Sequence, residues 1–92
     1  MHITGSKTFE KEYKKSPEDV KLKVKAIYAE FSLLSLDQIK THPKVKRMVN
    51  DKNYYRYRFG VYRLGFEIIL ERDTVKFLTV QHRKDVYRNL WD

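Results

Sequence analysis

The sequence contains no cysteine, only three glycines and two prolines, and no long apolar run. Without cysteine, disulfides and thiolate metal sites are excluded, and a reducing cytoplasm is compatible with the composition. So few glycines exclude a glycine-rich phosphate loop of the usual kind. The histidines, His2, His42 and His82, lie far apart with no ligand spacing. We therefore expect neither a metal site nor a cofactor.

Membrane and export signals are also absent from the sequence. The N-terminus, MHITGSKTFEKEYKK, goes directly into charged residues and has no apolar core of a signal peptide. The most apolar stretches, FSLLSL and FEIIL, are far shorter than a membrane span. The sequence predicts a cytoplasmic protein with no membrane partner.

What the sequence does contain is positive charge. Its 92 residues suffice for one domain, residues 1–92, and carry a formal charge of +8 from 20 Lys and Arg against 12 Asp and Glu. Such a balance indicates a nucleic acid, an anionic membrane or an acidic protein as partner. Nearly all lysines precede residue 54, and arginine dominates after it. The lysines are explained equally well as a solvated helix surface.

The first half has helical periodicity after a short opening strand, His2–Thr4. Ser6 predicts the start of a helix over residues 6–15, and Ser16 followed by Pro17 predicts the cap and first position of a second over 17–31. The second helix carries an apolar stripe at helical spacing: Val20, Val24, Ile27, Tyr28 and Phe31. A short helix around Leu36 and Ile39 should end before Pro43, and Val45 and Met48 are candidates to complete the core.

From Tyr54 the periodicity changes to two, which is typical of strands. Gly60 and residues 71–73 predict turns, residues 74–81 a third strand, and residues 83–91 a short helix or turn. The expected fold is α+β: a short N-terminal strand, an antiparallel helix pair, a three-stranded antiparallel meander with the helices on one face, and a short C-terminal helix.

Alternation places Arg56 and Arg58 on one face of their strand, opposite Tyr55, Tyr57 and Phe59. Arg63 opens the next strand across a tight turn and should join them. Like charges so close repel one another unless an anion is bound. The three arginines therefore indicate a phosphate site, although they could also be the polar positions of a half-exposed sheet.

The segment from Gln81 to Arg88 supplies further candidate groups. His82 has an unperturbed pKa near neutrality and Tyr87 has a phenol, so either could transfer a proton during RNA cleavage. Arg83 is a further candidate to clamp the phosphate, and Lys84 and Arg88 are candidate RNA contacts. Equally, His82 could be an ordinary hydrogen-bonded residue, and Tyr87 could pack on Val86 and Leu90.

The runs YYRYRFGVYRLGFEI and VKFLTVQHRKDVYRNLW resemble the RelE/ParE superfamily of type II toxins. The resemblance spans the whole chain in element order. It is most specific in residues 58–63 and 82–87. It implies a toxin held inactive by a cognate acidic antitoxin, with a toxin–antitoxin hetero-oligomer as the expected assembly.

The RelE branch of that superfamily implies a metal-independent endoribonuclease, which cleaves mRNA in the ribosomal A site by 2′-hydroxyl attack and contacts rRNA there. The resemblance assigns catalytic roles to Arg63, Arg83 and Tyr87, and backbone binding to Arg56 and Arg58. Members of this branch have lysines at the last two positions, one of them a general acid. Arginine is a poor proton donor, so His82 or Tyr87 would transfer the proton, or ribosomal positioning would contribute more. The ParE branch implies instead a gyrase inhibitor without nuclease activity, and an RNA-binding domain without cleavage is a third alternative.

Overall fold

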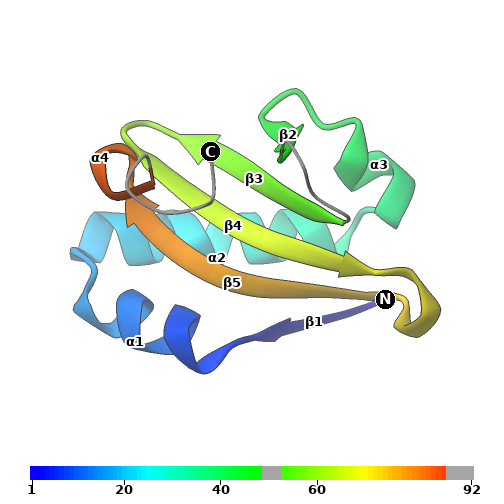
Figure 1. Cartoon of the computed structure of the whole chain (residues 1–92), viewed down its shortest axis with the longest axis horizontal. Coiled ribbons are helices and arrows are strands. Elements are labelled where there is room, and N and C mark those ends of the chain that lie inside the picture. The colour runs from blue at the N-terminus through cyan, green and yellow to red at the C-terminus, as the bar shows by residue number, and fades with distance from the viewer. Residues whose placement is uncertain (49–52, 87–92) are drawn as a thin grey trace.

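The computed structural model describes residues 1–48 and 53–86. They form a sheet with a helix packed along one face (Figure 1). Along the chain the elements are β1 (His2–Gly5), α1 (Lys7–Lys15), α2 (Glu18–Ser32), α3 (Leu36–Lys40), β2 (Val45–Arg47), β3 (Tyr54–Phe59), β4 (Tyr62–Ile69), the 3-10 turn η1 (Leu70–Arg72), β5 (Thr74–His82) and α4 (Arg83–Val86). The α+β class and the predicted order of helices and strands are confirmed.

The sheet has five strands in the order β1-β5-β4-β3-β2. The predicted antiparallel meander β3-β4-β5 forms its centre, and β1 pairs in parallel with β5 at one edge. At the other edge lies β2, which the sequence did not predict, antiparallel to β3. Gly60, with φ of 57°, makes the tight β3–β4 turn in the left-handed region that glycine tolerates.

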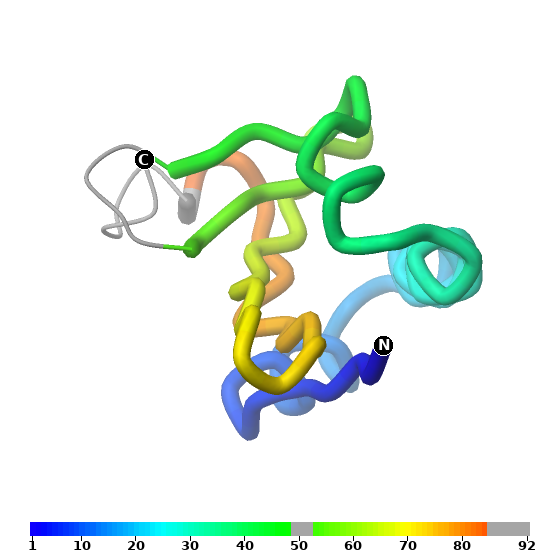
Figure 2. The backbone as a smooth tube through the Cα atoms, turned by 90° about the vertical axis from the view of Figure 1, so that its right-hand side faces the viewer, coloured from blue at the N-terminus to red at the C-terminus, as the bar shows by residue number. Residues whose placement is uncertain are grey.

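The core lies between the sheet and α2, which runs along one face of the sheet (Figures 1 and 2). Phe31 contacts the rings of Tyr57, Phe66 and Phe77 edge-on. Four residues of the predicted helical stripe are buried in this core, whereas Tyr28 is half exposed. The predicted contact between the aromatic strand positions and α2 is confirmed for the buried set: Val20, Val24, Ile27, Phe31, Tyr55, Tyr57, Phe59, Leu64, Phe66 and Ile68.

Two of the predicted helix ends are confirmed, the cap of α1 at Ser6 and the end of α3 before Pro43, and one differs. Ser6 caps α1 by accepting a hydrogen bond from Phe9 N–H at 3.0 Å. Ser35 and Gln38 form a capping box that starts α3. Ser16, however, does not start α2: it ends α1, and its hydroxyl donates to the Glu12 carbonyl. The hydroxyl of Ser16 is thus used within α1, and Pro17 takes the cap position of α2 without a side-chain hydrogen bond.

Helix α1 covers the edge of β5 beyond the point where β1 ends. Ser6 N–H donates to the Phe77 carbonyl at 2.9 Å, which continues the pairing. Six residues later, the Glu12 carboxylate accepts hydrogen bonds from the Thr79 hydroxyl, from Val80 N–H at 3.3 Å and from the Gln81 amide at 3.1 Å. A carboxylate thus takes the place of a neighbouring strand along this part of the edge.

The two residues proposed to complete the core have different positions. Val45 packs against the core cluster, as predicted. Met48 is buried, but its N–H donates to the Tyr54 carbonyl, and it lies outside the core cluster. Among residues 1–48 and 53–86, no helix is long and apolar enough to cross a bilayer.

Candidate nucleic-acid interface

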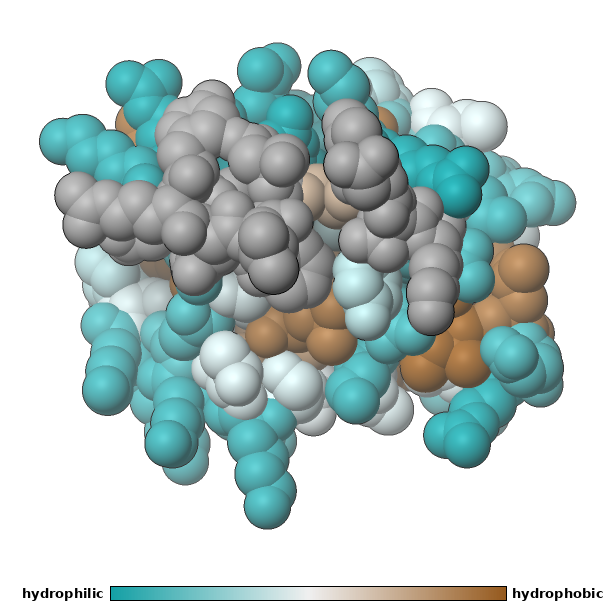
Figure 3. All heavy atoms as spheres, in the orientation of Figure 1, coloured by the Kyte–Doolittle hydropathy of each residue, from teal (hydrophilic) through white to brown (hydrophobic). Residues whose placement is uncertain are grey.

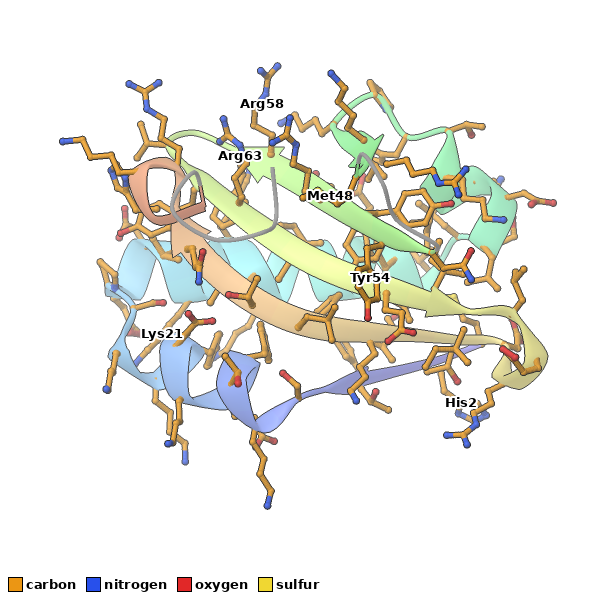
Figure 4. The ribbon with its side chains drawn as sticks, in the orientation of Figure 1. His2, Lys21, Met48, Tyr54, Arg58 and Arg63 are labelled. Carbon is orange, nitrogen blue, oxygen red and sulfur yellow. The ribbon has the colours of Figure 1, made fainter. Side chains whose placement is uncertain are left out.

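The sheet face opposite α2 carries the arginines that sequence alternation singled out. In β3, Tyr55, Tyr57 and Phe59 are buried, whereas Arg56 is half-buried and Arg58 exposed. The strand register pairs Arg58 directly with Arg63 of β4, and Figure 4 shows both side chains near the β3–β4 turn. The predicted placement of Arg56, Arg58 and Arg63 on one face is confirmed.

Two like charges at directly opposed positions of an antiparallel pair destabilise a sheet. The Arg63 guanidinium is held close to the turn, because it donates to the Gly60 carbonyl at 3.2 Å and the Tyr62 carbonyl at 2.9 Å. Its position opposite Arg58 therefore follows from the strand register, and its guanidinium contacts the backbone of the turn.

The end of β5 brings Arg83 to the same turn. Arg83 N–H donates to the Val61 carbonyl at 2.7 Å, which fixes the start of α4 beside the turn that positions Arg63. Arg83 and Lys84 are both exposed. The structure therefore brings the Arg83 backbone to the turn between Arg58 and Arg63, while Arg56 lies further along β3 on the same face as Arg58. Tyr87 and Arg88 lie outside the described residues, so their predicted roles stay predictions.

His82 does not join this group. Its register partner is Tyr62, whereas Arg63 pairs with Gln81, so His82 lies on the helix side of the sheet. Its ring meets Tyr62 edge-on at 5.5 Å, and its Nδ1 accepts from Lys84 N–H at 3.2 Å. The cause is an irregularity in β5: Gly65 pairs with Thr79 and Phe66 with Phe77, so the alternation shifts by one residue before His82.

The structure adds two lysines to the basic surface, Lys44 and Lys46. With Pro43, Val45, Arg56 and Arg58 they line a hollow of about 230 Å³ at the β2–β3 edge. Lys46 is the register partner of Arg56. Hydrophilic side chains gather along this edge in Figure 3. In the sequence, Lys44 and Lys46 have the same i, i+2 spacing as Arg56 and Arg58. Because β2 was not predicted as a strand, this spacing did not indicate that the two lysines share a face.

Beneath this edge lies a hydrogen-bonded cluster of Glu30, His42 and Tyr57. Glu30 accepts from His42 Nε2–H at 3.0 Å and from the Tyr57 hydroxyl at 3.1 Å. The hydrogen bond with His42 holds the pKa of the Glu30 carboxyl below its ordinary value of 4.5, and the bond from Tyr57 acts in the same direction. Burial, followed by the Glu30 charge and hydrogen bond, raises the pKa of Tyr57 to about 12. The cluster joins α2, the loop before β2, and β3.

Away from the arginines, the structure has an apolar groove and no grouped metal ligands among the described residues. An apolar groove of about 310 Å³ lies between α1, α2 and β1, and its lining includes Phe9, Tyr13, Val24, Tyr28 and Phe77. In the part of the chain that the structure describes, no three His, Asp or Glu side chains are grouped so that they could hold a metal ion.

Comparison with known proteins shows which family the chain belongs to. Residues 4–87 match the family model of the ParE toxin of type II toxin–antitoxin systems. The chain is 36% identical over 88 residues to Toxin RelE3 of Methanocaldococcus jannaschii, which covers 95% of this chain and 96% of that protein. It therefore belongs to a family of toxins.

Solved structures agree with this relationship. The toxin–antitoxin complex RelB–RelE of Methanococcus jannaschii matches with a TM-score of 0.74 and 32% identity, covering 92% of this chain and 95% of that one. The isolated E. coli RelE toxin matches in fold, with a TM-score of 0.71 at 18% identity over 95% and 96% of the two chains. The chain thus belongs to the RelE/ParE superfamily of type II toxin–antitoxin toxins.

Proposed function

We propose that this toxin is a metal-independent endoribonuclease that cleaves mRNA in the ribosomal A site, with the RNA's own 2′-hydroxyl as nucleophile. The observation that carries the proposal is the directly opposed pair Arg58 and Arg63 on the exposed sheet face, beside the backbone-anchored Arg83. In this proposal the guanidinium groups of Arg58, Arg63 and Arg83 bind a single phosphate group.

The arginines have separable roles in this proposal. Arg56 and Arg58 hold the RNA backbone from β3. Arg63 and Arg83 donate hydrogen bonds to the non-bridging oxygens of the scissile phosphate, which gain charge as the phosphorane forms. Because such bonds strengthen in the transition state, they lower the barrier rather than only tightening binding. The planar guanidinium fork suits two phosphate oxygens better than a lysine ammonium does.

Proton transfer needs a different group, because guanidinium stays protonated at any physiological pH. His82 faces the helix side of the sheet, where its Nδ1 is already an acceptor for Lys84 N–H. We therefore assign the base that takes the 2′-hydroxyl proton to the Tyr87 phenol, the other candidate that the sequence offers. In this assignment His82 is a positioning residue, which shapes the junction between β5 and the segment that carries Arg83 and Lys84.

The family model favours a second candidate, because its description is that of a ParE toxin. A ParE-like protein would inhibit DNA gyrase and need no RNA cleavage. Induced expression in growing cells separates the two functions. The nuclease produces fragmented mRNA and arrested translation, whereas the gyrase inhibitor produces DNA breaks and filamentous cells. Intact mRNA in cells that carry DNA breaks would replace our proposal with the gyrase function.

We also propose a cognate acidic antitoxin as the partner, in a toxin–antitoxin hetero-oligomer. Two features support this proposal: the formal charge of +8, and the open apolar groove that contains Phe9, Tyr13 and Tyr28. An amphipathic antitoxin helix would bury its apolar side in this groove, and its acidic residues would meet Lys21 and Lys25 at the rim. Lys21 Nζ already lies 6.0 Å from the centre of the Tyr13 ring.

A further inference from the structure

Helix α2 is apolar on two opposite sides. The side toward the sheet carries the buried stripe of the core, and the outer side carries a second stripe whose members are all exposed: Leu22, Ala26, Ala29 and Leu33. They lie four, three and four residues apart, so they share one face of the helix. Leu22 is 59% exposed, and Leu33, which ends the helix with a right-handed helical backbone, is 86% exposed.

No described element covers this outer stripe. Figure 2 looks almost along α2, which stands at the side of the molecule with its outer side open. None of the four residues belongs to the core cluster or lines the apolar groove beside α1. A surface helix usually presents polar and charged residues on its outer side. Lysine and glutamate form helices about as well as leucine, so helix propensity does not require an apolar stripe here.

The order of residues along the stripe is symmetric. Read from either end of the helix, it gives leucine, alanine, alanine and leucine at the same spacing. If two copies of α2 pack antiparallel, Leu22 of each copy lies opposite Leu33 of the other, and Ala26 lies opposite Ala29. This is the alternating spacing of a short coiled-coil seam. The small alanines at its centre allow the two helices to approach closely, and the leucines close both ends.

The charged residues beside the stripe fit the same arrangement. On one flank Lys23 and Glu30 are seven residues apart, and the antiparallel register brings Lys23 of each copy close to Glu30 of the other. The Glu30 side chain is still 41% exposed, although it accepts two hydrogen bonds within its own chain. On the other flank, Lys25 meets the uncharged Ser32. The contact is therefore complementary to itself in charge as well as in shape, as a two-fold symmetric interface must be.

From this we infer that the outer stripe of α2 is an interface with a second copy of this chain, in which the two α2 helices pack antiparallel about a two-fold axis. A single helix from each copy makes the contact. It is therefore smaller than a standard stable interface of roughly 1,200–2,000 Å², and the dimer is weak and dissociates on dilution. Because α2 covers the sheet face opposite the arginines, both arginine faces stay open in the dimer. The inference is independent of the proposed ribonuclease activity.

The absence of cysteine makes the register of this dimer directly testable. The variants Leu22→Cys and Leu33→Cys are checked for a wild-type melting temperature and then oxidised, each alone and as an equimolar mixture. The mixture should form a disulfide-linked dimer, because the antiparallel register brings the two positions within the short distance that a disulfide requires. Each variant alone should stay largely monomeric, since its two copies of the cysteine lie at opposite ends of the seam.

Glu10→Cys, at an exposed position of α1, is the control for random collisions. Crosslinking of the mixture no higher than that of this control would overturn the inference. Equal crosslinking in the mixture and in the single variants would also overturn it, because the register would then not be antiparallel. A Leu33→Cys thiol that reacts freely in the free toxin and is protected only by the antitoxin would assign the stripe to the antitoxin instead.

Sedimentation of the purified toxin over a range of protein concentrations gives a second measurement. The wild type should shift from monomer toward dimer as its concentration rises. Leu33→Glu should raise the concentration for half-dimerisation by about tenfold or more, since each copy then brings an unpaired carboxylate into the contact. Leu70→Glu, the same change at a leucine that is exposed outside the stripe, should dimerise like the wild type. A wild type that stays monomeric at every concentration, or equal effects of the two substitutions, would overturn the inference.

Discussion

At the scale of single residues, the pairing of two arginines across neighbouring strands bears most directly on the proposed function. Arg58 and Arg63 oppose each other directly across β3 and β4. A neutral side chain at either position would suit the sheet better, because like charges directly opposite each other destabilise it. Residues that lower stability at one exposed spot are characteristic of sites that bind an oppositely charged ligand.

This pairing predicts that Arg58→Gln stabilises the free toxin, by about 0.2–1 kcal/mol, because it removes the repulsion from Arg63. Chemical denaturation at low ionic strength measures the change. The control Lys23→Gln removes a charge of the same sign from the exposed surface of α2 and should be close to neutral. The gain should shrink when phosphate is added, since the anion stabilises only the protein with both arginines. A destabilised Arg58→Gln protein would mean that the pair is not under electrostatic strain.

The two candidate proton-transfer residues give opposite predictions. Tyr87→Phe removes one hydroxyl and should slow single-turnover cleavage by about 10²–10⁴-fold, the usual contribution of a general base. His82→Gln should leave the rate within a few-fold of wild type, because the ring lies against Tyr62 on the helix side of the sheet. A large loss with His82→Gln, in a variant that melts like the wild type, would return the proton-transfer role to the imidazole.

At the scale of elements, the position of the site depends on how β5 is held. The Glu12 carboxylate bonds to Thr79, Val80 and Gln81, immediately before the segment that delivers Arg83. We expect Glu12→Ala to lower the free energy of unfolding by about 1.5–3 kcal/mol, because a charged acceptor is lost and the Thr79 hydroxyl is buried. Thr79 is only 4% exposed. Urea denaturation measures the change, with Glu10→Ala, at an exposed position of the same helix, as the matched control. Equal losses of unfolding free energy in the two variants would contradict a stabilising contact between Glu12 and β5.

The hydrogen-bonded cluster of Glu30, His42 and Tyr57, which joins α2, the loop before β2 and β3, predicts that stability depends on pH. The pKa of Glu30 is lowered in the folded state, so its stabilising effect is present above its ordinary value of 4.5 and is lost as pH falls through the folded pKa. Glu30→Gln should therefore melt below the wild type at neutral pH, and the two melting temperatures should converge in acid. Glu71→Gln, at an exposed position, should show no such convergence. A constant difference across the whole pH range would contradict a role for the carboxylate charge.

Prediction from sequence succeeded where the periodicity was long and failed where a single residue decided the outcome. The alternation over β3 and β4 was sufficient to place Arg56, Arg58 and Arg63 on one face, because the two-residue turn at Gly60 leaves little choice of register. The three-residue strand β2 was missed, since so short a run has no recognisable period. The same holds for Lys44 and Lys46, which depend on it.

The position of His82 shows a different limit. Simple alternation from Phe77 would have placed it among the arginines. One irregular residue in β5 reverses that assignment, and nothing in the local sequence announces it. Ser16 is a similar case: its sequence fits a cap for α2, but its hydroxyl bonds to the Glu12 carbonyl, and the serine ends α1 instead.

At the scale of the whole molecule, charge and shape are divided between two faces. The open sheet face and the β2–β3 edge carry the arginines and the basic hollow, whereas the apolar groove lies on the helical side between α1 and α2. Under the proposed function, RNA and an antitoxin helix would use different surfaces of the molecule.

The central claim is that the arginine face cleaves mRNA on the ribosome. Single-turnover cleavage of mRNA on programmed ribosomes, at saturating toxin and without added antitoxin, tests it most directly. The wild type should cut within the A-site codon, and Arg63→Ala should cut about 100- to 1,000-fold more slowly, the loss that follows removal of one oxyanion donor. Lys23→Gln should cut at the wild-type rate. Intact mRNA with the wild-type toxin, or an Arg63→Ala rate equal to that of Lys23→Gln, would contradict the claim.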